Sequence, residues 1–120
     1  MRFGIMTLQR DILIPSGGSM QEAMAQLATF DHADLARQLH AQGFHLIELS
    51  GDMVAFFPHS FAAPTIERLA ALKQDRGVAY TVHLPLWSVE PSTPLAPVRK
   101  GSVRALIDTL RATLPLEPEM

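Results

Sequence analysis

The run from residue 77 to residue 85, G-V-A-Y-T-V-H-L-P, constrains the fold of this chain more than any other stretch. It contains no Asp, Glu, Lys or Arg, so it predicts a strand buried on both faces, as in a parallel sheet. Because side chains alternate across a strand, Thr81 and His83 share one face. His83 falls at the carboxyl end of the strand, just before Pro85. In parallel α/β folds, that end of the sheet carries the functional site.

Composition narrows the class of protein. The chain has 120 residues, of which 48% are hydrophobic, so we expect a single domain over residues 1–120 with its own core. A net charge of −2 leaves no basic surface for nucleic acid or an anionic membrane. The absence of cysteine excludes disulfides and thiolate metal sites, and it fits a cytoplasmic protein. No signal peptide is recognisable after Met1, and no apolar run reaches the ~20 residues of a membrane helix.

Strand and helix patterns alternate along the chain. Ser19 and Glu22 have the spacing of a capping box, which predicts the start of the first helix. The predicted strands cover residues 2–8, 44–49 and 78–83, and the predicted helices cover residues 20–29, 31–42, 64–76 and 98–114. We expect loops at 50–63 and 84–97. The apolar residues Val103, Leu106, Ile107, Leu110 and Leu114 are predicted to lie on one face of the last helix.

This βα, βα, βα order predicts a parallel sheet in which the strands lie in sequence order. No G-x-G-x-x-G motif follows the first strand, which disfavours a dinucleotide-binding sheet. Long loops after strands and short glycine connections after helices favour the first three βα units of a (β/α)8 TIM barrel. A complete barrel needs ~250 residues, so we expect an incomplete barrel, the N-terminal fragment of a longer fold. Its open strand edges predict self-association.

Three segments carry a family resemblance: R-F-G-I-M-T-L near the N-terminus, G-F-H-L-I-E-L-S at residues 43–50 and R-G-V-A-Y-T-V-H-L-P at residues 76–85. They resemble the xylose-isomerase-like TIM barrel superfamily, which includes sugar phosphate isomerases, epimerases and apurinic endonucleases. The resemblance covers residues 2–114. It implies a divalent metal ion (Mn, Mg, Co or Zn) and a sugar or sugar phosphate as substrate. His83 matches a metal ligand of the endonuclease branch by position, whereas in the isomerase branch this position more often contacts substrate.

The remaining candidate residues follow from their place in the predicted elements. Glu48 shares a strand face with Leu46, and a carboxylate in an apolar strand is costly unless it is paired. It is therefore either half of a structural ion pair or a catalytic residue that orients a ligand. Phe57 and Trp87 lie in loops on the same side of the sheet and are expected to wall a substrate pocket. The segment Ser16–Ser19 is read as a loop and helix cap rather than a phosphate site, and His32, His40 and His45 are read as surface residues.

These residues and the resemblance together predict a sugar isomerase or epimerase that uses metal-assisted proton transfer. A metal-dependent phosphodiesterase of the endonuclease type is the alternative, although the near-neutral charge disfavours a DNA substrate. A truncated, non-catalytic remnant is a third possibility, because the later strands of a barrel would carry most of the active site.

Overall fold

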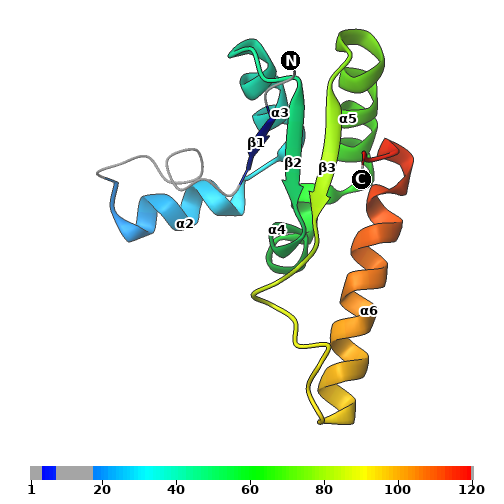
Figure 1. Cartoon of the computed structure of the whole chain (residues 1–120). Coiled ribbons are helices and arrows are strands. Elements are labelled where there is room, and N and C mark those ends of the chain that lie inside the picture. The colour runs from blue at the N-terminus through cyan, green and yellow to red at the C-terminus, as the bar shows by residue number, and fades with distance from the viewer. Residues whose placement is uncertain (1–3, 8–17, 120) are drawn as a thin grey trace.

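The computed structural model describes residues 4–7 and 18–119 and shows a mixed α/β fold built on a three-stranded parallel sheet (Figure 1). The strands are β1 (Gly4–Met6), β2 (Leu46–Ser50) and β3 (Ala79–His83), hydrogen-bonded in the order β1-β2-β3. The register aligns Met6, Glu48 and Thr81 in one row across the sheet and pairs Ser50 with His83. The predicted strand order and direction are therefore confirmed within the described residues.

The four predicted helices are present in the predicted order, and one further helix, α4 (Gly51–Phe56), lies between the second and the third. The predicted four are α2 (Met20–Ala28), α3 (His32–Ala41), α5 (Ala63–Arg76) and α6 (Ala96–Thr113), with short 3-10 turns η1 (Pro58–Phe61) and η2 (Leu114–Leu116). The capping box of α2 is confirmed, since Ser19 and Glu22 each bond the backbone N–H of the other. Ser16 and Gly17 lie outside the described residues. No helix within the described ranges is long and apolar enough to cross a membrane.

The predicted loop at residues 50–63 is wrong, because α4 and η1 occupy most of it. The Ser50 hydroxyl accepts a hydrogen bond from the Met53 N–H and caps the first turn of α4. Pro58 then begins η1, where the missing proline N–H costs nothing in the first turn. Helices this short carry no periodicity that a sequence pattern can reveal.

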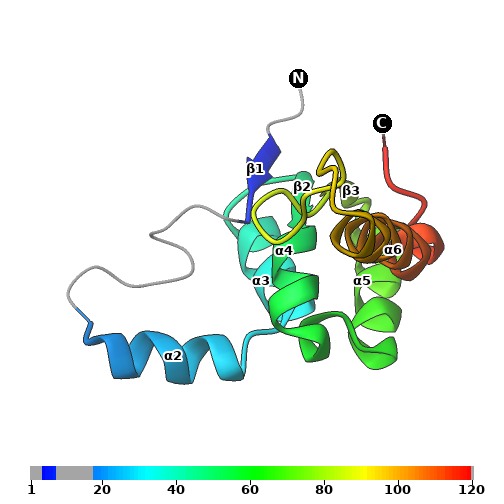
Figure 2. The same cartoon turned by 90° about the horizontal axis from the view of Figure 1, so that it is seen from below.

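Among the described residues, helices cover only one face of the sheet. Viewed along the strands, α3, α4 and α5 lie on the same side (Figure 2). Ile47 and Leu49 of β2 and Tyr80 of β3 point into this layer, and each is at most 1% exposed. Tyr80 also donates a hydrogen bond from its hydroxyl to the Leu69 carbonyl of α5 at 3.0 Å. The core of the described chain therefore lies between the sheet and these helices.

The prediction that the third strand is buried on both faces is wrong. Thr81 and His83 are only half-buried, because no described element covers the second face of the sheet, and Val82 is half-buried on the helix-covered face. We call this second face the open face. Gly4, Met6, Leu46, Glu48 and Thr81 lie on it, in the alternation that the sequence predicts. The absence of charged residues indicates that a strand is buried, but it does not show which element packs against each of its faces.

The apolar face of α6 does not belong to the core. Its large apolar residues are exposed, at 41% for Val103, 39% for Ile107 and 47% for Leu110. The buried residues of α6 are instead the small polar ones, namely Ser102, Thr109 and Thr113. The two threonine hydroxyls donate to carbonyls of the preceding turn, so their burial leaves no unpaired polar atom. Small side chains let α6 approach its neighbours α4 and η2 while the large ones face away.

His32 was expected at the surface, and this expectation is wrong. The ring is fully buried between Phe30 and Phe61, with ring centroids 4.7 and 4.3 Å away in edge-on contact. Its Nδ1 lies 3.1 Å from the Ser60 carbonyl oxygen. Burial lowers the pKa of His32 to about 4. Phe61 and Ser60 reach His32 from η1, the turn that the sequence pattern did not reveal.

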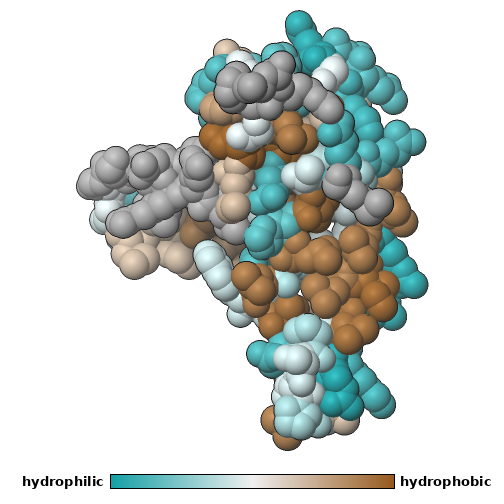
Figure 3. Space-filling model, in the orientation of Figure 1, coloured by the Kyte–Doolittle hydropathy of each residue, from teal (hydrophilic) through white to brown (hydrophobic). Residues whose placement is uncertain are grey.

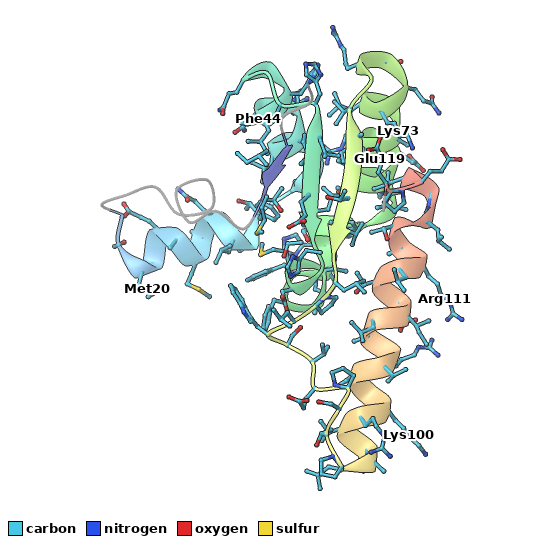
Figure 4. The ribbon with its side chains drawn as sticks, viewed as in Figure 1. Met20, Phe44, Lys73, Lys100, Arg111 and Glu119 are labelled. Carbon is cyan, nitrogen blue, oxygen red and sulfur yellow. The ribbon has the colours of Figure 1, made fainter. Side chains whose placement is uncertain are left out.

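The C-terminal tail returns to the free edge of β3. Leu116 is fully buried in the core, and Lys73 of α5 donates to the carbonyls of Leu116 and Glu117 at 2.7 and 3.0 Å. The backbone N–H of Glu119 then donates to the Tyr80 carbonyl at 2.7 Å. Lys73 and Glu119 are labelled beside β3 in Figure 4. The tail therefore pairs with the N-terminal half of β3 on the side away from β2.

Candidate functional site

Glu48 and His83 meet on the open face, near the carboxyl ends of two neighbouring strands. Parallel pairing of β2 and β3 brings together two residues that are 35 positions apart in the sequence. The Nδ1 atom of His83 lies 3.3 Å from Oε1 of Glu48, and the two side chains are 35% and 29% exposed. Each residue was predicted separately as a site residue, and the structure brings them into contact. The half-buried carboxylate of Glu48 therefore has the His83 imidazole as its partner.

A shallow hollow of about 170 Å³ lies beside Glu48 on the open face and extends toward the amino ends of β1 and β2. Glu48 and Thr81 supply polar groups at one side, whereas Met6 and Leu46 supply apolar walls. Gly4 and Ile5 complete the lining. Gly4, Glu48 and His83 were predicted to lie near a common concave surface; Gly4 and Glu48 line this hollow, whereas His83 does not. An apolar wall beside one carboxylate suits a small molecule that carries both carbon and hydroxyl groups.

Gly51 fixes the backbone directly behind His83. A Cβ atom on Gly51 would lie 2.7 Å from the His83 carbonyl oxygen and 2.5 Å from Cδ of Pro85. Real Cβ contacts essentially never come below 3.0 Å, so a residue with a side chain cannot occupy this position without movement of β3 or Pro85. Gly51 therefore holds the end of β3 against the start of α4. Sequence reasoning missed this role because the contact joins residues that are distant in the chain.

Asp52 is a second residue beside the candidate site whose contacts sequence reasoning missed. It is 3% exposed, and its carboxylate accepts hydrogen bonds from the N–H groups of Leu86, Trp87 and Ser88 at 3.0–3.1 Å. The Ser88 hydroxyl donates a fourth at 2.8 Å. Burial alone would raise the pKa of Asp52, but these hydrogen bonds together hold that pKa below its usual value. Asp52 is therefore an ionised anchor for the loop after β3.

Trp87 and Phe57 lie apart from the hollow. The Trp87 side chain is 75% exposed, and only its backbone N–H reaches Asp52. The ring of Phe57 packs edge-on against His59, with centroids 6.0 Å apart. Neither residue lines the hollow beside Glu48. Their predicted contact with substrate stays a prediction.

Glu48 and His83 offer the kinds of ligand atom that a divalent metal ion binds, but two ligands are too few to hold one. A carboxylate oxygen and an imidazole nitrogen are common ligands of Mn, Mg, Co or Zn. A protein site usually supplies at least three such ligands, and the described residues contain no group of three His, Cys, Asp or Glu side chains that could hold an ion. Glu48 and His83 alone therefore do not make a metal centre.

Searches of protein-family models, of curated proteins and of solved structures found no match to this chain. No relative therefore tests the resemblance to the xylose-isomerase-like superfamily.

Proposed function

We propose that this chain forms the first three βα units of a (β/α)8 barrel and that its Glu48–His83 pair takes part in proton transfer on a sugar or sugar phosphate. The supporting observation is the position of the pair. It lies near the carboxyl ends of parallel strands, on the face that would become the interior of a barrel. The reaction class is that of sugar isomerases and epimerases.

The chemistry follows from the contact between the two side chains. When His83 carries its proton on Nδ1, that N–H donates to Glu48 and fixes the orientation of the ring. Nε2 is then a free base that accepts a hydrogen bond from a substrate hydroxyl. Glu48, beside the hollow, accepts the proton of a carbon next to a carbonyl group. The metal ion that the resemblance implies supplies charge stabilisation when bound, and it needs ligands besides this pair.

Solvent deuterium exchange tests this function directly. The protein is incubated in D₂O with aldoses, ketoses and their phosphates, with and without Mn²⁺, and exchange at the carbon next to the carbonyl is followed by NMR. We expect His83→Gln to lose most of the exchange while the free energy of unfolding changes by no more than about 1 kcal/mol. His59→Gln, which changes an exposed histidine outside the hollow, is the matched control.

The results separate the three predicted classes. Exchange that depends on both Glu48 and His83 supports an isomerase or epimerase. Hydrolysis of a small phosphodiester in place of exchange would favour the phosphodiesterase alternative. Neither activity, with a large loss of stability in His83→Gln, would favour a structural pair in a non-catalytic remnant.

A further inference from the structure

Thr81 carries a hydroxyl group on the open face, directly beside Glu48. The register of the parallel pair β2 and β3 aligns the two residues, and neighbouring strands of a sheet lie about 4.8 Å apart. Both side chains line the hollow. Figure 3, which views the open face, shows a narrow hydrophilic strip there with apolar surface beside it. A ligand in the hollow therefore meets a carboxylate and a hydroxyl that start from adjacent strands.

The Thr81 hydroxyl has no hydrogen-bond partner within the part of the chain that the structure describes. Other threonine hydroxyls are used: Thr65 donates to the Asp31 carboxylate at 2.8 Å, and Thr109 and Thr113 donate to carbonyls of their own helix. The Thr81 side chain is only half-buried, so its hydroxyl is open to solvent. A ligand oxygen can therefore accept from this hydroxyl without breaking a hydrogen bond of the described chain.

Glu48 keeps one carboxylate oxygen for a ligand. His83 contacts Oε1 at 3.3 Å, and no described residue donates to Oε2. An ionised carboxylate can only accept, whereas the Thr81 hydroxyl can also donate. The two side chains thus place a base and a hydrogen-bond donor at adjacent positions. Removal of a proton from a carbon beside a carbonyl group needs this combination, because negative charge develops on the carbonyl oxygen as the proton leaves.

We propose that Thr81 donates a hydrogen bond to the carbonyl oxygen of the substrate and stabilises the charge that forms there, while Glu48 removes the proton from the adjacent carbon. This assignment rests on the proposed function and narrows its substrate to a small compound with a hydroxyl group beside a ketone or aldehyde. The restricted side-chain rotamers of a β-branched residue hold the donor in place before the reaction begins.

The step balances without a further reactant. The proton of the C–H bond moves to Glu48, the electron pair of that bond becomes the C=C bond of an enediolate, and the carbonyl π electrons move to the oxygen. Thr81 donates to that oxygen and keeps its own proton. In D₂O the Glu48 carboxyl exchanges its proton for a deuteron. Return of the deuteron to the same carbon regenerates the carbonyl compound with one hydrogen replaced by deuterium.

Deuterium exchange of dihydroxyacetone in D₂O tests the role of Thr81 in the reaction. Thr81→Val removes the hydroxyl at similar size, and valine suits a strand. It should lower kcat for exchange by about 10²-fold and change KM by less than about threefold, because the lost hydrogen bond strengthens only in the transition state. Thr81→Ser keeps the donor and should recover most of the wild-type kcat. Chemical denaturation checks that both variants fold, and Thr81→Ala replaces Thr81→Val if the latter does not.

Binding of glycolohydroxamate provides a second measurement that needs no turnover. This planar molecule resembles the enediolate, and its carbonyl oxygen can accept from the Thr81 hydroxyl. Titration calorimetry in EDTA keeps metal ions out of the comparison. Thr81→Val should weaken binding about tenfold, which corresponds to the loss of one hydrogen bond, whereas Thr81→Ser should bind nearly as tightly as the wild type.

The outcomes distinguish the role of Thr81 from the proposed function. Wild-type exchange whose kcat Thr81→Val leaves unchanged would overturn the role of Thr81 and leave the proposed function standing. Hydroxamate binding that depends on the Thr81 hydroxyl, without exchange of any sugar, would support the hydrogen bond from Thr81 and count against the proposed function alone. A wild-type chain that neither binds the hydroxamate nor catalyses exchange would overturn both.

Discussion

Gly51 and His83 meet where β2 and β3 end: a Cβ atom on Gly51 would lie 2.7 Å from the His83 carbonyl oxygen. The backbone that follows β2 and the backbone that ends β3 are thus in van der Waals contact beneath the candidate site. The position of His83 depends on a residue that carries no side chain. This dependence gives the first prediction.

We expect Gly51→Ala to destabilise the fold by about 1–3 kcal/mol, the usual cost of overpacking a close contact. It should also move the His83 ring relative to Glu48, because the end of β3 or Pro85 must shift. Chemical denaturation measures the first effect, and the NMR shifts of the His83 ring measure the second.

Gly101→Ala is the matched control. Gly101 lies within α6, and a Cβ atom there would meet nothing within 4 Å. This change should raise stability by about 0.5–1 kcal/mol through helix propensity alone. Equal effects of the two substitutions would contradict the role assigned to Gly51.

The sequence predicts the sheet well because the relevant signals are local. Alternation along β2 and β3 places Glu48 and His83 on one face, and sequential right-handed crossovers place the two strands side by side. Their contact follows from these two rules. Gly51 and Asp52 escaped prediction because their partners lie more than 30 residues away and are recognisable only when the chain is folded. The exposure of the apolar side of α6 could not be predicted for a related reason, because periodicity shows an apolar stripe but not what covers it.

Asp52→Asn should loosen the loop after β3. The substitution replaces one acceptor oxygen by an NH₂ donor, which then faces an N–H of Leu86 or Ser88. We expect a loss of about 1–3 kcal/mol in the free energy of unfolding. Trp87 is the only tryptophan of the chain, so a drop in its fluorescence anisotropy reports directly on this loop. Asp75→Asn, at an exposed position of α5, should change neither quantity.

Leu116→Ala should destabilise the chain strongly although it lies only four residues from the C-terminus. Leu116 is fully buried in the core, and its carbonyl accepts a hydrogen bond from Lys73. A truncation of this kind costs about 2–5 kcal/mol. Met20→Ala, at a residue that is 79% exposed, should stay within about 0.5 kcal/mol of the wild type. Equal melting temperatures for the two variants would show that the tail does not belong to the core.

His32 should make the stability of the protein depend on pH between about 4 and 6.5. Its pKa is about 4 in the folded chain and 6.5 when exposed, so the unfolded state binds a proton first as the pH falls. Stability is therefore complete above pH 6.5, falls as the pH drops through this window and levels off near pH 4. A shift of this size corresponds to about 3 kcal/mol. Urea denaturation at a series of pH values measures it.

The variant that isolates this effect is His32→Gln, which keeps an N–H donor for the Ser60 carbonyl but does not titrate. Its stability should be nearly flat from pH 6.5 to 4.5, whereas the control His59→Gln should keep the wild-type slope. Asp31 and Asp52 do not contribute to the difference in slope between the variants. The pKa of each carboxyl is lowered below its usual 3.8, so its protonation destabilises the fold only at a pH lower than this window. Should His32→Gln keep the wild-type slope, the buried ring would not be its source, and another group would have to supply the proton uptake.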